Sequence, residues 1–467
     1  MIRALTSAQM READRRAIAA GTPGEVLMER AGARVAEFIE RTFAPLNAQR
    51  AVIVCGKGNN GGDGLVVARL LEGRVAALQV VRVTDAPAPL DRDATLVIDA
   101  LFGTGFHVDL STTDGRAADL IRAMNQDFPK AKIVAVDIPS AMQVRADYTV
   151  TFAALKAEML LSPHAANAGG IIVADIGIPD EHLPADLFLS EAQDFAALFQ
   201  PRGRDTHKGD FGHVLVVGGA AGKTGAAAMT GLAAARIGAG LVTVACAEAS
   251  RLAPELMWNP LDSIELERKT VLAIGPGLGL QHDLVARLLK DLTVPTLIDA
   301  DGLNSIAGAD FRGRGVATIL TPHPGEMARL TGTKATDRLA AAHAFAQERN
   351  VCLVLKGYRT LIALPDGRAW INPTGSPALA KGGSGDILTG LIAGLVAQHP
   401  QYIDLAVRAA VWLHGRAGEL AAAELTEFCV LATDLLAYLP QAIRETAPLP
   451  SRPRNGSPSS PVTEPRP

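Results

Sequence analysis

The sequence has few aromatic residues and almost no net charge. Phe, Tyr and Trp make up 4% of the 467 residues, which argues against an aromatic surface for stacking nucleic-acid bases. Lys and Arg number 45 and Asp and Glu number 49, so the formal net charge at pH 7 is −4. A chain-wide basic footprint is thereby excluded, and we expect no nucleic-acid partner.

Cysteine is also scarce, and no long apolar run is present. The four cysteines form no C-x-x-C pair, which excludes a zinc site or a disulfide scaffold of that kind and predicts buried free thiols in a reducing cytoplasm: Cys55, Cys246, Cys352 and Cys429. The first residues contain no apolar segment typical of a signal peptide. Gly225–Ala247 is the least polar stretch, but Arg236 interrupts it, so it predicts a buried helix and a strand and no membrane span.

Glycine, by contrast, is abundant, with 45 residues. At about 150 residues per domain, the length predicts two or three domains. Short β-branched runs alternate with helical stretches in two successive sets, and this alternation predicts parallel sheets with crossover helices. We expect one domain over 1–199, a second over 200–446, and a disordered Pro/Ser-rich tail over 447–467.

Two helices are predicted before the first strands, over Ser7–Ala20 and Gly24–Phe43. The predicted strands of the first set are 51–55, 76–83, 95–98, 133–136, 148–152 and 171–176. Those of the second set are 214–217, 241–245, 271–274, 296–298, 317–320 and 351–355. Between the sets, Pro179–Arg204 is acidic and then rich in Pro, Arg and Gly, and no strand is expected there.

The first glycine cluster is Gly56–Gly64, between the strand 51–55 and a helix expected over Leu65–Leu71. Its glycines match the G-x-G-x-x-G pattern of a dinucleotide-binding dehydrogenase, and Asp85 lies near the position of a ribose-binding acid. A plain tight turn explains the same glycines. The cluster also carries Asn59, Asn60 and Asp63, whose side-chain oxygens suit a hard cation or polar ligand contacts.

Two later strands end in similar polar positions. Asp99 ends the strand 95–98, and Asp137 and Ser140 follow the strand 133–136. Because the carboxyl ends of parallel strands meet at one edge of a sheet, these residues and Asn60 are expected to share a ligand site there. Each acid alone is also explained as a turn or helix-capping residue.

Residues 1–180 resemble the NAD(P)H-hydrate epimerase domain family. The resemblance rests on Leu27–Gly32, Gly58–Gly64, Asp99–Gly105, Val136–Ser140 and Asp175–Pro179. It implies a potassium ion held by Asn60, Asp99 and Ser140, and Asp137 as the acid/base. It also implies substrate contacts by Asn59, Asn60, Gly61, Gly62, Asp63, Gly103, Thr104, Gly105, Phe106, His107, Val108, Asp109 and Asp137.

One departure from this family concerns the residues after Ser140. The family continues with Ser-Gly-Leu and a loop rich in Asp and Gly, whereas this chain reads Ala141–Arg145 and enters the next strand. Part of the site wall is therefore expected to be shorter. A domain that only binds or stabilises remains an alternative to an active epimerase.

The second half contains further glycine clusters. Val217–Thr224 lacks the first glycine of a Walker A loop, so a P-loop is not predicted. Lys381–Gly390 is more informative, because Gly382–Gly385 precede a helix expected over 386–397. Exposed amides at such a helix start bind anions. Asp386, placed beside a bound phosphate, suits proton abstraction from a hydroxyl, although it is also explained as a helix cap.

Residues 200–440 resemble ribokinase-like enzymes, and more closely the ADP/ATP-dependent NAD(P)H-hydrate dehydratases. The matching segments are 207–209, 212–214, 238–240, 275–279, 299–304, 321–326, 355–357 with Thr360, and 382–386. The resemblance implies nucleotide contacts by Lys356, Gly357, Tyr358, Arg359, Thr360 and Gly385. It implies contacts to the hydrated cofactor by Ala226, Gly277, His323 and Asp386. Asp299 and Asp301 either serve the cation that accompanies the nucleotide or cap a turn.

These observations combine into one prediction. We expect an α/β protein with an N-terminal Rossmann-like three-layer sandwich and a C-terminal ribokinase-like three-layer α/β/α domain. The first domain would epimerise R and S NADHX and NADPHX with K⁺, and the second would dehydrate the S form with ADP or ATP and Mg²⁺. A homo-oligomer is expected. The alternatives are a dehydratase with a non-catalytic N-terminal module, or a ribokinase-like small-molecule kinase.

Overall fold

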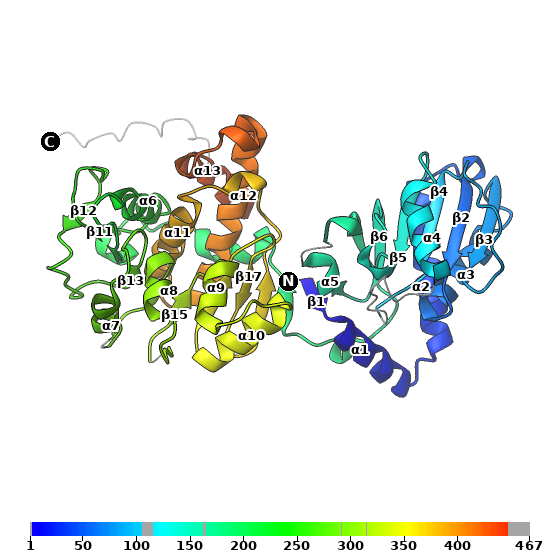
Figure 1. Cartoon of the computed structure of the whole chain (residues 1–467), viewed down its shortest axis with the longest axis horizontal. Coiled ribbons are helices and arrows are strands. Elements are labelled where there is room, and N and C mark those ends of the chain that lie inside the picture. Colours follow the sequence, from blue (N-terminus) through cyan, green and yellow to red (C-terminus); the bar gives the residue numbers. More distant parts are fainter. Residues whose placement is uncertain (1, 105–114, 162–164, 291, 314, 447–467) are drawn as a thin grey trace, which may run out of the picture. The chain divides into compact units, whose positions relative to one another are not determined.

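The computed structural model describes residues 2–104, 115–161, 165–290, 292–313 and 315–446. The chain divides into two compact units, Met1–Leu189 and Ser190–Pro467, and each is described by itself (Figure 1). The predicted substrate contacts Gly105, Phe106, His107, Val108 and Asp109, and the predicted tail over 447–467, lie outside the described residues.

A parallel sheet forms the centre of unit 1. Its strands lie in the order β3-β2-β4-β5-β6-β8, and all their pairings are parallel. The strands are β2 (Arg50–Cys55), β3 (Ala77–Arg82), β4 (Leu96–Ala100), β5 (Lys132–Val136), β6 (Tyr148–Phe152) and β8 (Gly170–Ala174). The predicted β-branched runs therefore mark these strands, as expected for strands buried on both faces.

Three short strands of unit 1 lie outside this sheet: β1 (Ile2–Leu5) pairs parallel with β7 (Leu155–Lys156) and antiparallel with β9 (Leu187–Leu189). The expectation that Pro179–Arg204 contains no strand was wrong, because β9 lies within it. Leu187 and Phe188 are buried, but an apolar run of three residues is too short to show a strand period.

Helices cover both faces of the unit 1 sheet (Figure 1). They are α1 (Ser7–Ala19), α2 (Gly24–Thr42), α3 (Asn59–Leu71), α4 (Gly115–Gln126) and α5 (Ala157–Leu160). Ile53 and the apolar residues of α1, α2 and α3 share one buried cluster, whereas Val52, Val54 and α4 share another. This alternation along β2 confirms the predicted three-layer sandwich. Thr6 and Gln9 form the predicted capping box of α1.

Nine strands of unit 2 lie in the order β12-β11-β10-β13-β14-β15-β16-β17-β18. The pairings from β12 to β16 are parallel, and β17 and β18 continue antiparallel. The strands are β10 (His213–Val217), β11 (Leu241–Ala245), β12 (Met257–Asn259), β13 (Val271–Ile274), β14 (Thr296–Ile298), β15 (Thr318–Leu320), β16 (Cys352–Leu355), β17 (Leu361–Ala363) and β18 (Ala369–Ile371).

Eight described helices surround this sheet: α6 (Thr224–Arg236), α7 (His282–Lys290), α8 (Ala300–Ile306), α9 (Pro324–Thr331), α10 (Arg338–Arg349), α11 (Ser384–Gln398), α12 (Ile403–Cys429) and α13 (Leu435–Thr446). Helices α6 and α11 pack against each other and against β10. Gly390 and Gly394 allow this approach, because a Cβ at Gly390 would lie 2.6 Å from the Ala233 Cβ. Helix α11 starts two residues before the predicted position.

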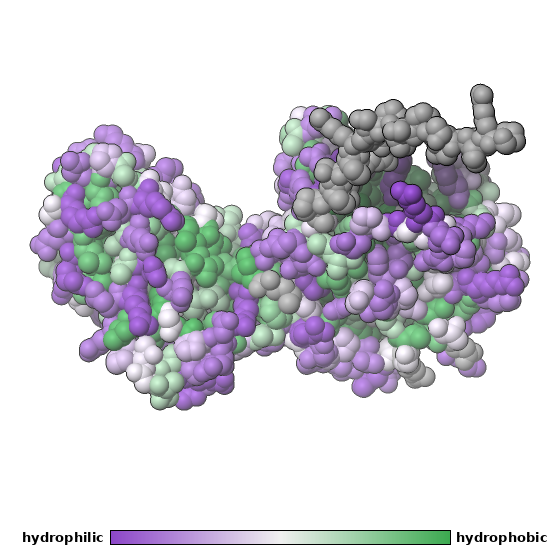
Figure 2. Space-filling model, turned by 180° about the vertical axis from the view of Figure 1, so that it is seen from behind, coloured by the Kyte–Doolittle hydropathy of each residue, from purple (hydrophilic) through white to green (hydrophobic). Residues whose placement is uncertain are grey.

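Of the described helices, none combines the length and the hydropathy needed to cross a membrane. Gly225–Ala247 forms most of α6 together with β11, which confirms the predicted helix and strand. Figure 2 shows hydrophilic side chains spread over the visible face of each unit, with hydrophobic ones between them. Cys55, Cys246 and Cys352 are buried free thiols, as predicted, but Cys429 is exposed, because the end of α12 leaves the core beside the 89% exposed Phe428.

Two candidate active sites

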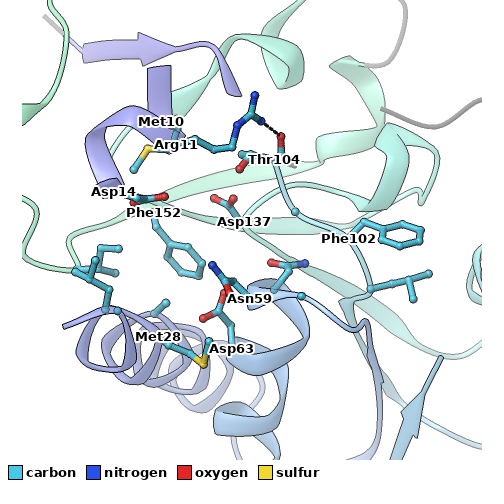
Figure 3. Close-up of a pocket in the computed structure, with 18 of the residues that line it drawn as sticks. Met10, Arg11, Asp14, Met28, Asn59, Asp63, Phe102, Thr104, Asp137 and Phe152 are labelled. Carbon is cyan, nitrogen blue, oxygen red and sulfur yellow. Dashed lines mark hydrogen bonds between the residues drawn. The ribbon is translucent and has the colours of Figure 1, made fainter. Parts of the chain in front are cut away.

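Unit 1 has a pocket of about 840 Å³ beyond the carboxyl ends of its central strands (Figure 3). The first turn of α3, which follows β2, contributes Asn59. The loops after β4 and β5 contribute Phe102 and Asp137, and helix α1 contributes Met10 and Asp14. Since α/β sheets bind ligands at this edge, the pocket is the candidate site of unit 1.

The glycine-rich turn brings the start of α3 against the sheet. The helix begins at Asn59, so the prediction that it begins at Leu65 was wrong. A Cβ at Gly61 would overlap the Gly56 carbonyl oxygen, and one at Gly64 would lie 2.5 Å from the Ala100 Cβ. The close approach of α3 to the sheet thus requires glycine at these positions. Because the glycines allow this approach, the helix begins only a few residues after the end of β2. No side chain caps the helix at Gly58, which leaves its first amides available to a ligand.

The predicted metal ligands Asp99 and Ser140 contact each other. The Ser140 hydroxyl donates to Asp99 Oδ1 at 2.5 Å, and the Ser140 amide donates to Asp99 Oδ2 at 2.7 Å. Burial raises the pKa of Asp99 to about 6, although these hydrogen bonds from Ser140 act in the opposite direction. The amide of Phe102 donates to the Ser140 hydroxyl at 2.8 Å, which ties the loop after β4 to the pair.

Asn60 is the third predicted ligand, and its side chain is buried. Its Oδ1 and Nδ2 have no hydrogen-bond partner among the described residues. A Cβ at Gly103 would lie 3.4 Å from Asn60 Oδ1, so Asn60 faces the loop that Phe102 ties to Ser140. A buried amide without a partner is rare and calls for an ion or ligand. Neutral amide and hydroxyl oxygens with one carboxylate suit a hard monovalent cation.

Asp137 follows β5 in a left-handed backbone conformation, with φ 66°. Strained conformations of this kind are concentrated at functional sites. Its Oδ1 lies 2.6 Å from Lys156 Nζ, and the Thr151 hydroxyl donates to the same oxygen at 3.2 Å. Lys156 is only 1% exposed, and it also donates to the Phe152 carbonyl at 2.8 Å. Sequence reasoning missed Lys156, because it lies in the two-residue strand β7 and no motif surrounds it.

Two further carboxyl groups share this pocket with Asp137. Burial, and then the charges of Asp137 and Asp14, raise the pKa of Asp63 to about 8. Burial, and then the charge of Asp137, raise the pKa of Asp14 to about 6. Sequence reasoning predicted Asp63 but missed Asp14, whose signal was an acid four residues after Met10 on the buried face of α1.

In unit 2, the candidate site lies at the start of α11. Gly383 has φ 93° at the N-cap, and no side chain caps the first amides of the helix. Burial, and then the charge of Asp299, raise the pKa of Asp386 in the first turn to about 6. A Cβ at Gly385 would lie 3.5 Å from Lys356 Nζ. A helix start that is able to bind an anion, a half-buried carboxyl group and a lysine are therefore adjacent.

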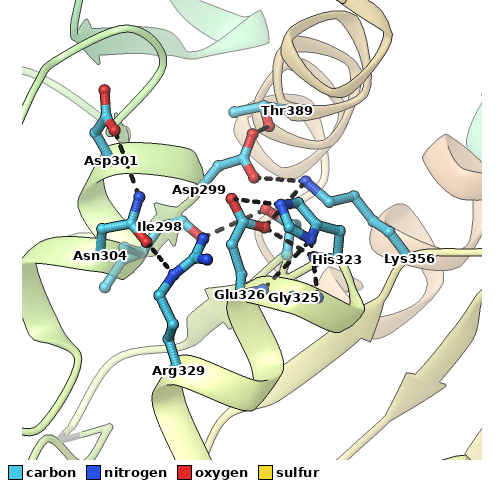
Figure 4. Close-up of polar contacts among 11 residues, drawn as sticks. Ile298, Asp299, Asp301, Asn304, His323, Gly325, Glu326, Arg329, Lys356 and Thr389 are labelled. Carbon is cyan, nitrogen blue, oxygen red and sulfur yellow. Dashed lines mark hydrogen bonds and ion pairs between the residues drawn. The ribbon is translucent and has the colours of Figure 1, made fainter. Parts of the chain in front are cut away.

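Asp299 holds the lysine of this site in place (Figure 4). Lys356 Nζ donates to Asp299 Oδ1 at 2.9 Å and lies 3.8 Å from Glu326 Oε2, while the Thr389 hydroxyl donates to Asp299 Oδ2 at 2.7 Å. Burial opposes the charged lysine, but these carboxylates outweigh it and raise the pKa of Lys356. Asp299 occupies the N-cap position of α8, but its side chain makes no capping hydrogen bond there. The structure therefore does not show the expected capping role, and a role toward a cation stays a prediction.

Asp301 and His323 make local contacts near this group. Asp301 Oδ2 accepts the Gly279 amide at 2.8 Å and lies 3.7 Å from Lys223 Nζ. His323 Nδ1 accepts the Gly325 amide at 3.0 Å and caps α9, and its Nε2 lies 3.6 Å from Glu326 Oε1. His323 is thus linked through Glu326 to the lysine of the site, and half of its side chain remains exposed.

The remaining predicted residues of unit 2 lie on two turns and, for Ala226, in the first turn of α6. Gly277 has φ 62°, and a Cβ there would lie 3.0 Å from the Ala226 Cβ, so the structure brings Gly277 and Ala226 together. Gly357, Tyr358, Arg359 and Thr360 form the turn after β16, with φ 145° at Gly357 and 53° at Arg359. Arg338 Nη1, which sequence reasoning missed, donates to the Tyr358 carbonyl at 2.9 Å and braces this turn.

Comparisons with known proteins divide the chain in the same order. The family described as NAD(P)H-hydrate dehydratase matches residues 214–441. The family described as YjeF-related protein N-terminus matches residues 24–95 and 81–166.

Curated relatives are similar over nearly the whole chain. The bifunctional NAD(P)H-hydrate repair enzyme Nnr of Moorella thermoacetica is 39% identical, over 94% of this chain and 96% of its own. The enzymes with the same name from Coxiella burnetii and Escherichia coli are 36% and 34% identical, over 92% and 89% of this chain and 97% and 89% of their own.

Solved structures are similar to one part of the chain. The ADP/ATP-dependent NAD(P)H-hydrate dehydratase of Bacillus subtilis, co-crystallised with ATP/Mg²⁺, is 33% identical with a TM-score of 0.52. It covers 56% of this chain and is itself covered completely. A ribokinase-like superfamily protein of Enterococcus faecalis is 28% identical with a TM-score of 0.51, over 56% of this chain and 96% of its own. These likenesses agree with the predicted ribokinase-like fold.

Proposed function

Since this chain belongs to the family of bifunctional NAD(P)H-hydrate repair enzymes, we propose that its two units carry the two repair activities. Unit 1 interconverts the R and S epimers of NADHX and NADPHX, and unit 2 uses ADP to dehydrate the S epimer to NADH or NADPH. The observation that carries the proposal is the half-buried Asp386 near Lys356, at a helix start with open amides.

In unit 2, hydroxide is a poor leaving group, so the hydroxyl must first be activated. Asp386 accepts the proton of the hydroxyl, whose oxygen attacks the terminal phosphorus of ADP and displaces AMP. The C–O bond then breaks, phosphate leaves with the electron pair, and loss of a ring proton restores the dihydronicotinamide. The first amides of α11 stabilise the charge that develops on the transferred phosphoryl group.

The predicted contacts of this site divide into two sets. We propose that Lys356, Gly357, Tyr358, Arg359, Thr360 and Gly385 bind the nucleotide. Ala226, Gly277, His323 and Asp386 contact the hydrated nicotinamide. The adjacency of Lys356 to Gly385 and of Gly277 to Ala226 supports both assignments.

Mg²⁺ would accompany the nucleotide in unit 2 and neutralise phosphate charge. Among the described residues, no group of three or more His, Cys, Asp or Glu side chains is arranged to hold a metal ion. Because Mg²⁺ at such sites is held mainly by phosphate oxygens, water and one or two carboxylates, a single carboxylate from the chain is sufficient. Asp301, beside Lys223, is the carboxylate that we propose for it.

The dehydratase assignment is tested by replacing Asp386. The variant Asp386→Ala lacks the base, so its turnover with NADHX and ADP should fall at least ~100-fold. Recovery of the near-ultraviolet absorbance of NADH measures turnover, and calorimetry checks that ADP still binds. Asp283→Asn, on the exposed surface of α7, is the control with unchanged rate. Unchanged turnover in Asp386→Ala would refute the assignment, and phosphorylation of an added alcohol without NADH recovery would favour a kinase.

In unit 1, we propose that Asp137 acts as acid/base on the carbon that bears the hydroxyl. Asn59, Asn60, Gly61, Gly62 and Asp63 contact the substrate, together with the residues from Gly103 to Asp109. The short segment after Ser140 forms a tight turn, with φ 54° at Ala141 and 53° at Met142. The pocket is present despite this shorter wall, and the proposed acid/base Asp137 lines it, which is compatible with an active epimerase.

We further propose that Asn60, Asp99 and Ser140 hold K⁺ in unit 1. The orphaned amide of Asn60 and the adjacent hydroxyl and carboxylate oxygens fit this ion. When bound, the ion neutralises carboxylate charge and orients the substrate hydroxyl. A ligand that binds only the folded state raises the Tm, so K⁺ should raise the Tm of unit 1 more than choline does, and Asn60→Ala should abolish the difference. Equal Tm values for the wild type in both salts would contradict the site.

Two further proposals concern the oligomeric state of the protein and its cellular compartment. We propose a homo-oligomer, which light scattering on the full chain tests. The three buried free thiols support a reducing compartment such as the cytoplasm.

A further inference from the structure

The pocket of unit 1 contains a carboxyl group that the proposed mechanism does not use. Asp14 reaches into the pocket from α1, on the side that faces Asp137, while Asp63 approaches from α3 (Figure 3). The outward face of α1 is different, because Glu12 there forms ion pairs with Arg15 and Arg16. No hydrogen bond or ion pair of the Asp14 carboxyl group is found within the described part of the chain. It therefore lines the pocket without a structural partner.

Inversion at the hydroxyl-bearing carbon needs proton transfer on both faces of the ring. That carbon is bonded to the ring nitrogen, so a protonated carboxyl group can donate its proton to the hydroxyl on one face. The C–O bond breaks, water leaves with the electron pair, and the nitrogen lone pair forms a C=N bond. Water then adds from the other face, a carboxylate takes its proton, and the C=N electron pair returns to nitrogen.

One water leaves and one is added, and one proton passes from the first carboxyl group to the second. The two groups then stand ready for the reverse direction. One acid on one side of the pocket reaches only one face of the ring and is insufficient for this cycle. Two acids on different sides of the pocket can transfer protons on both faces. The pocket offers Asp137 at the sheet edge and Asp14 on α1.

We propose that Asp14 is a second catalytic residue of the epimerase, sharing one proton with Asp137 across the pocket. This inference rests on the proposed epimerase function of unit 1. The other charged groups that line the pocket are Arg11 on α1, Glu25 on α2, Lys57 before α3, Asp63 on α3 and Lys156 on β7. Lys156 is occupied by Asp137, so the charge of Asp14 is not neutralised at contact distance.

Two acids that share a proton titrate as a pair. With both protonated no base remains, and with both ionised no acid remains, so the wild-type kcat/KM for epimerisation should be bell-shaped in pH. The raised pKa of Asp14, about 6, is consistent with a proton retained in the pocket.

The variant Asp14→Asn tests the inference in the full chain. Chromatography that separates R and S NADHX should show kcat for epimerisation lowered by ~100-fold or more, with KM changed by less than ~3-fold and the bell-shaped pH profile lost. Glu12→Gln, on the outward face of the same helix, is the matched control with wild-type kcat. Dehydration of S-NADHX by unit 2 and the Tm report folding in each variant.

The outcomes separate the two claims. If the wild type interconverts the epimers and Asp14→Asn does so with unchanged kcat and pH profile, the role of Asp14 is refuted and the epimerase function stands. If the wild type itself fails to interconvert them, the proposed function of unit 1 fails. A lowered kcat that Asp14→Glu partly restores, with an unchanged Tm, supports a catalytic role over a structural one.

Discussion

Asp137 and Asp386, the proposed acid/base residues of unit 1 and unit 2, differ in how their charge is balanced. Asp137 contacts Lys156 directly at 2.6 Å, so its carboxylate is held as an ion pair. Within the described residues Asp386 forms no ion pair, because Lys356 is engaged by Asp299 at 2.9 Å. Lys356 still lowers the pKa of Asp386, but burial and the charge of Asp299 outweigh it and raise that pKa to about 6. The dehydratase base is therefore expected to titrate near pH 6.

This environment predicts the pH dependence of dehydration. Asp386 must be ionised to accept a proton, so kcat/KM should rise with pH through about 6 and level off above it. Replacing Lys356 by Met removes a charge that lowers this pKa, so the midpoint should move to higher pH. The measurement is NADH recovery at saturating ADP across the pH range. A rate that falls as pH rises through this region would contradict the assignment of Asp386 as base.

At the scale of elements, the packing of α11 on α6 determines where Asp386 lies. Gly390 follows Asp386 by one helical turn, and a Cβ there would overlap the Thr230 carbonyl oxygen and lie 2.6 Å from the Ala233 Cβ. Thr230 also donates a hydrogen bond to the Asp386 carbonyl at 3.1 Å, so the two helices are joined at the site. Any separation of α11 from α6 therefore moves the base.

We predict that Gly390→Ala lowers the free energy of unfolding of unit 2 by about 1–3 kcal/mol, as overpacking does, and reduces dehydration. Gly225→Ala, in the first turn of α6, is the matched control, because its added Cβ meets no atom within 4 Å. Calorimetric melting of both variants and NADH recovery measure the effects. Equal melting temperatures for unit 2 in the two variants would contradict this prediction, because the contact between α6 and α11 would then accommodate the added methyl group.

Most of the strands, but not all of them, could be predicted from the sequence. The central strands were predicted closely, because β-branched runs such as 214–217 and 271–274 are buried on both faces and need no tertiary information. Strands β7 and β9 were missed, because two or three residues show no period and pairing with β1 defines them. The start of α3 was also missed, since glycines usually end helices and here permit close packing.

The residues of the candidate site in unit 1 were likewise predicted only in part. Residues that follow closely after a strand, such as Asn60 and Asp137, were found because chain order alone places the ends of these strands at one sheet edge. Asp14 and Lys156 were missed because α1 and β7 reach the pocket only through tertiary packing. A single acid or lysine in such an element has no motif around it.

At the scale of the whole molecule, the two units have separate candidate sites, each built from residues of one unit. The proposed dehydratase acts on one epimer, whereas hydration of the nicotinamide ring gives two. A chain with both activities removes a mixture completely, because epimerisation converts the R form as the S form is consumed. This reasoning requires only a shared substrate and no contact between the units.

A mixture of epimers therefore tests both units in one reaction. With R and S NADHX and excess ADP, the wild type should restore NADH until both epimers are consumed. Asp137→Asn should show the wild-type initial rate and then stop once the S form is exhausted, with slow further recovery from spontaneous epimerisation. Adding Asp386→Ala chain to the stopped reaction should restart it, because that variant keeps an intact unit 1. Complete conversion by Asp137→Asn alone at the wild-type rate would contradict Asp137 as the epimerase acid/base, since the R form would then be consumed without it.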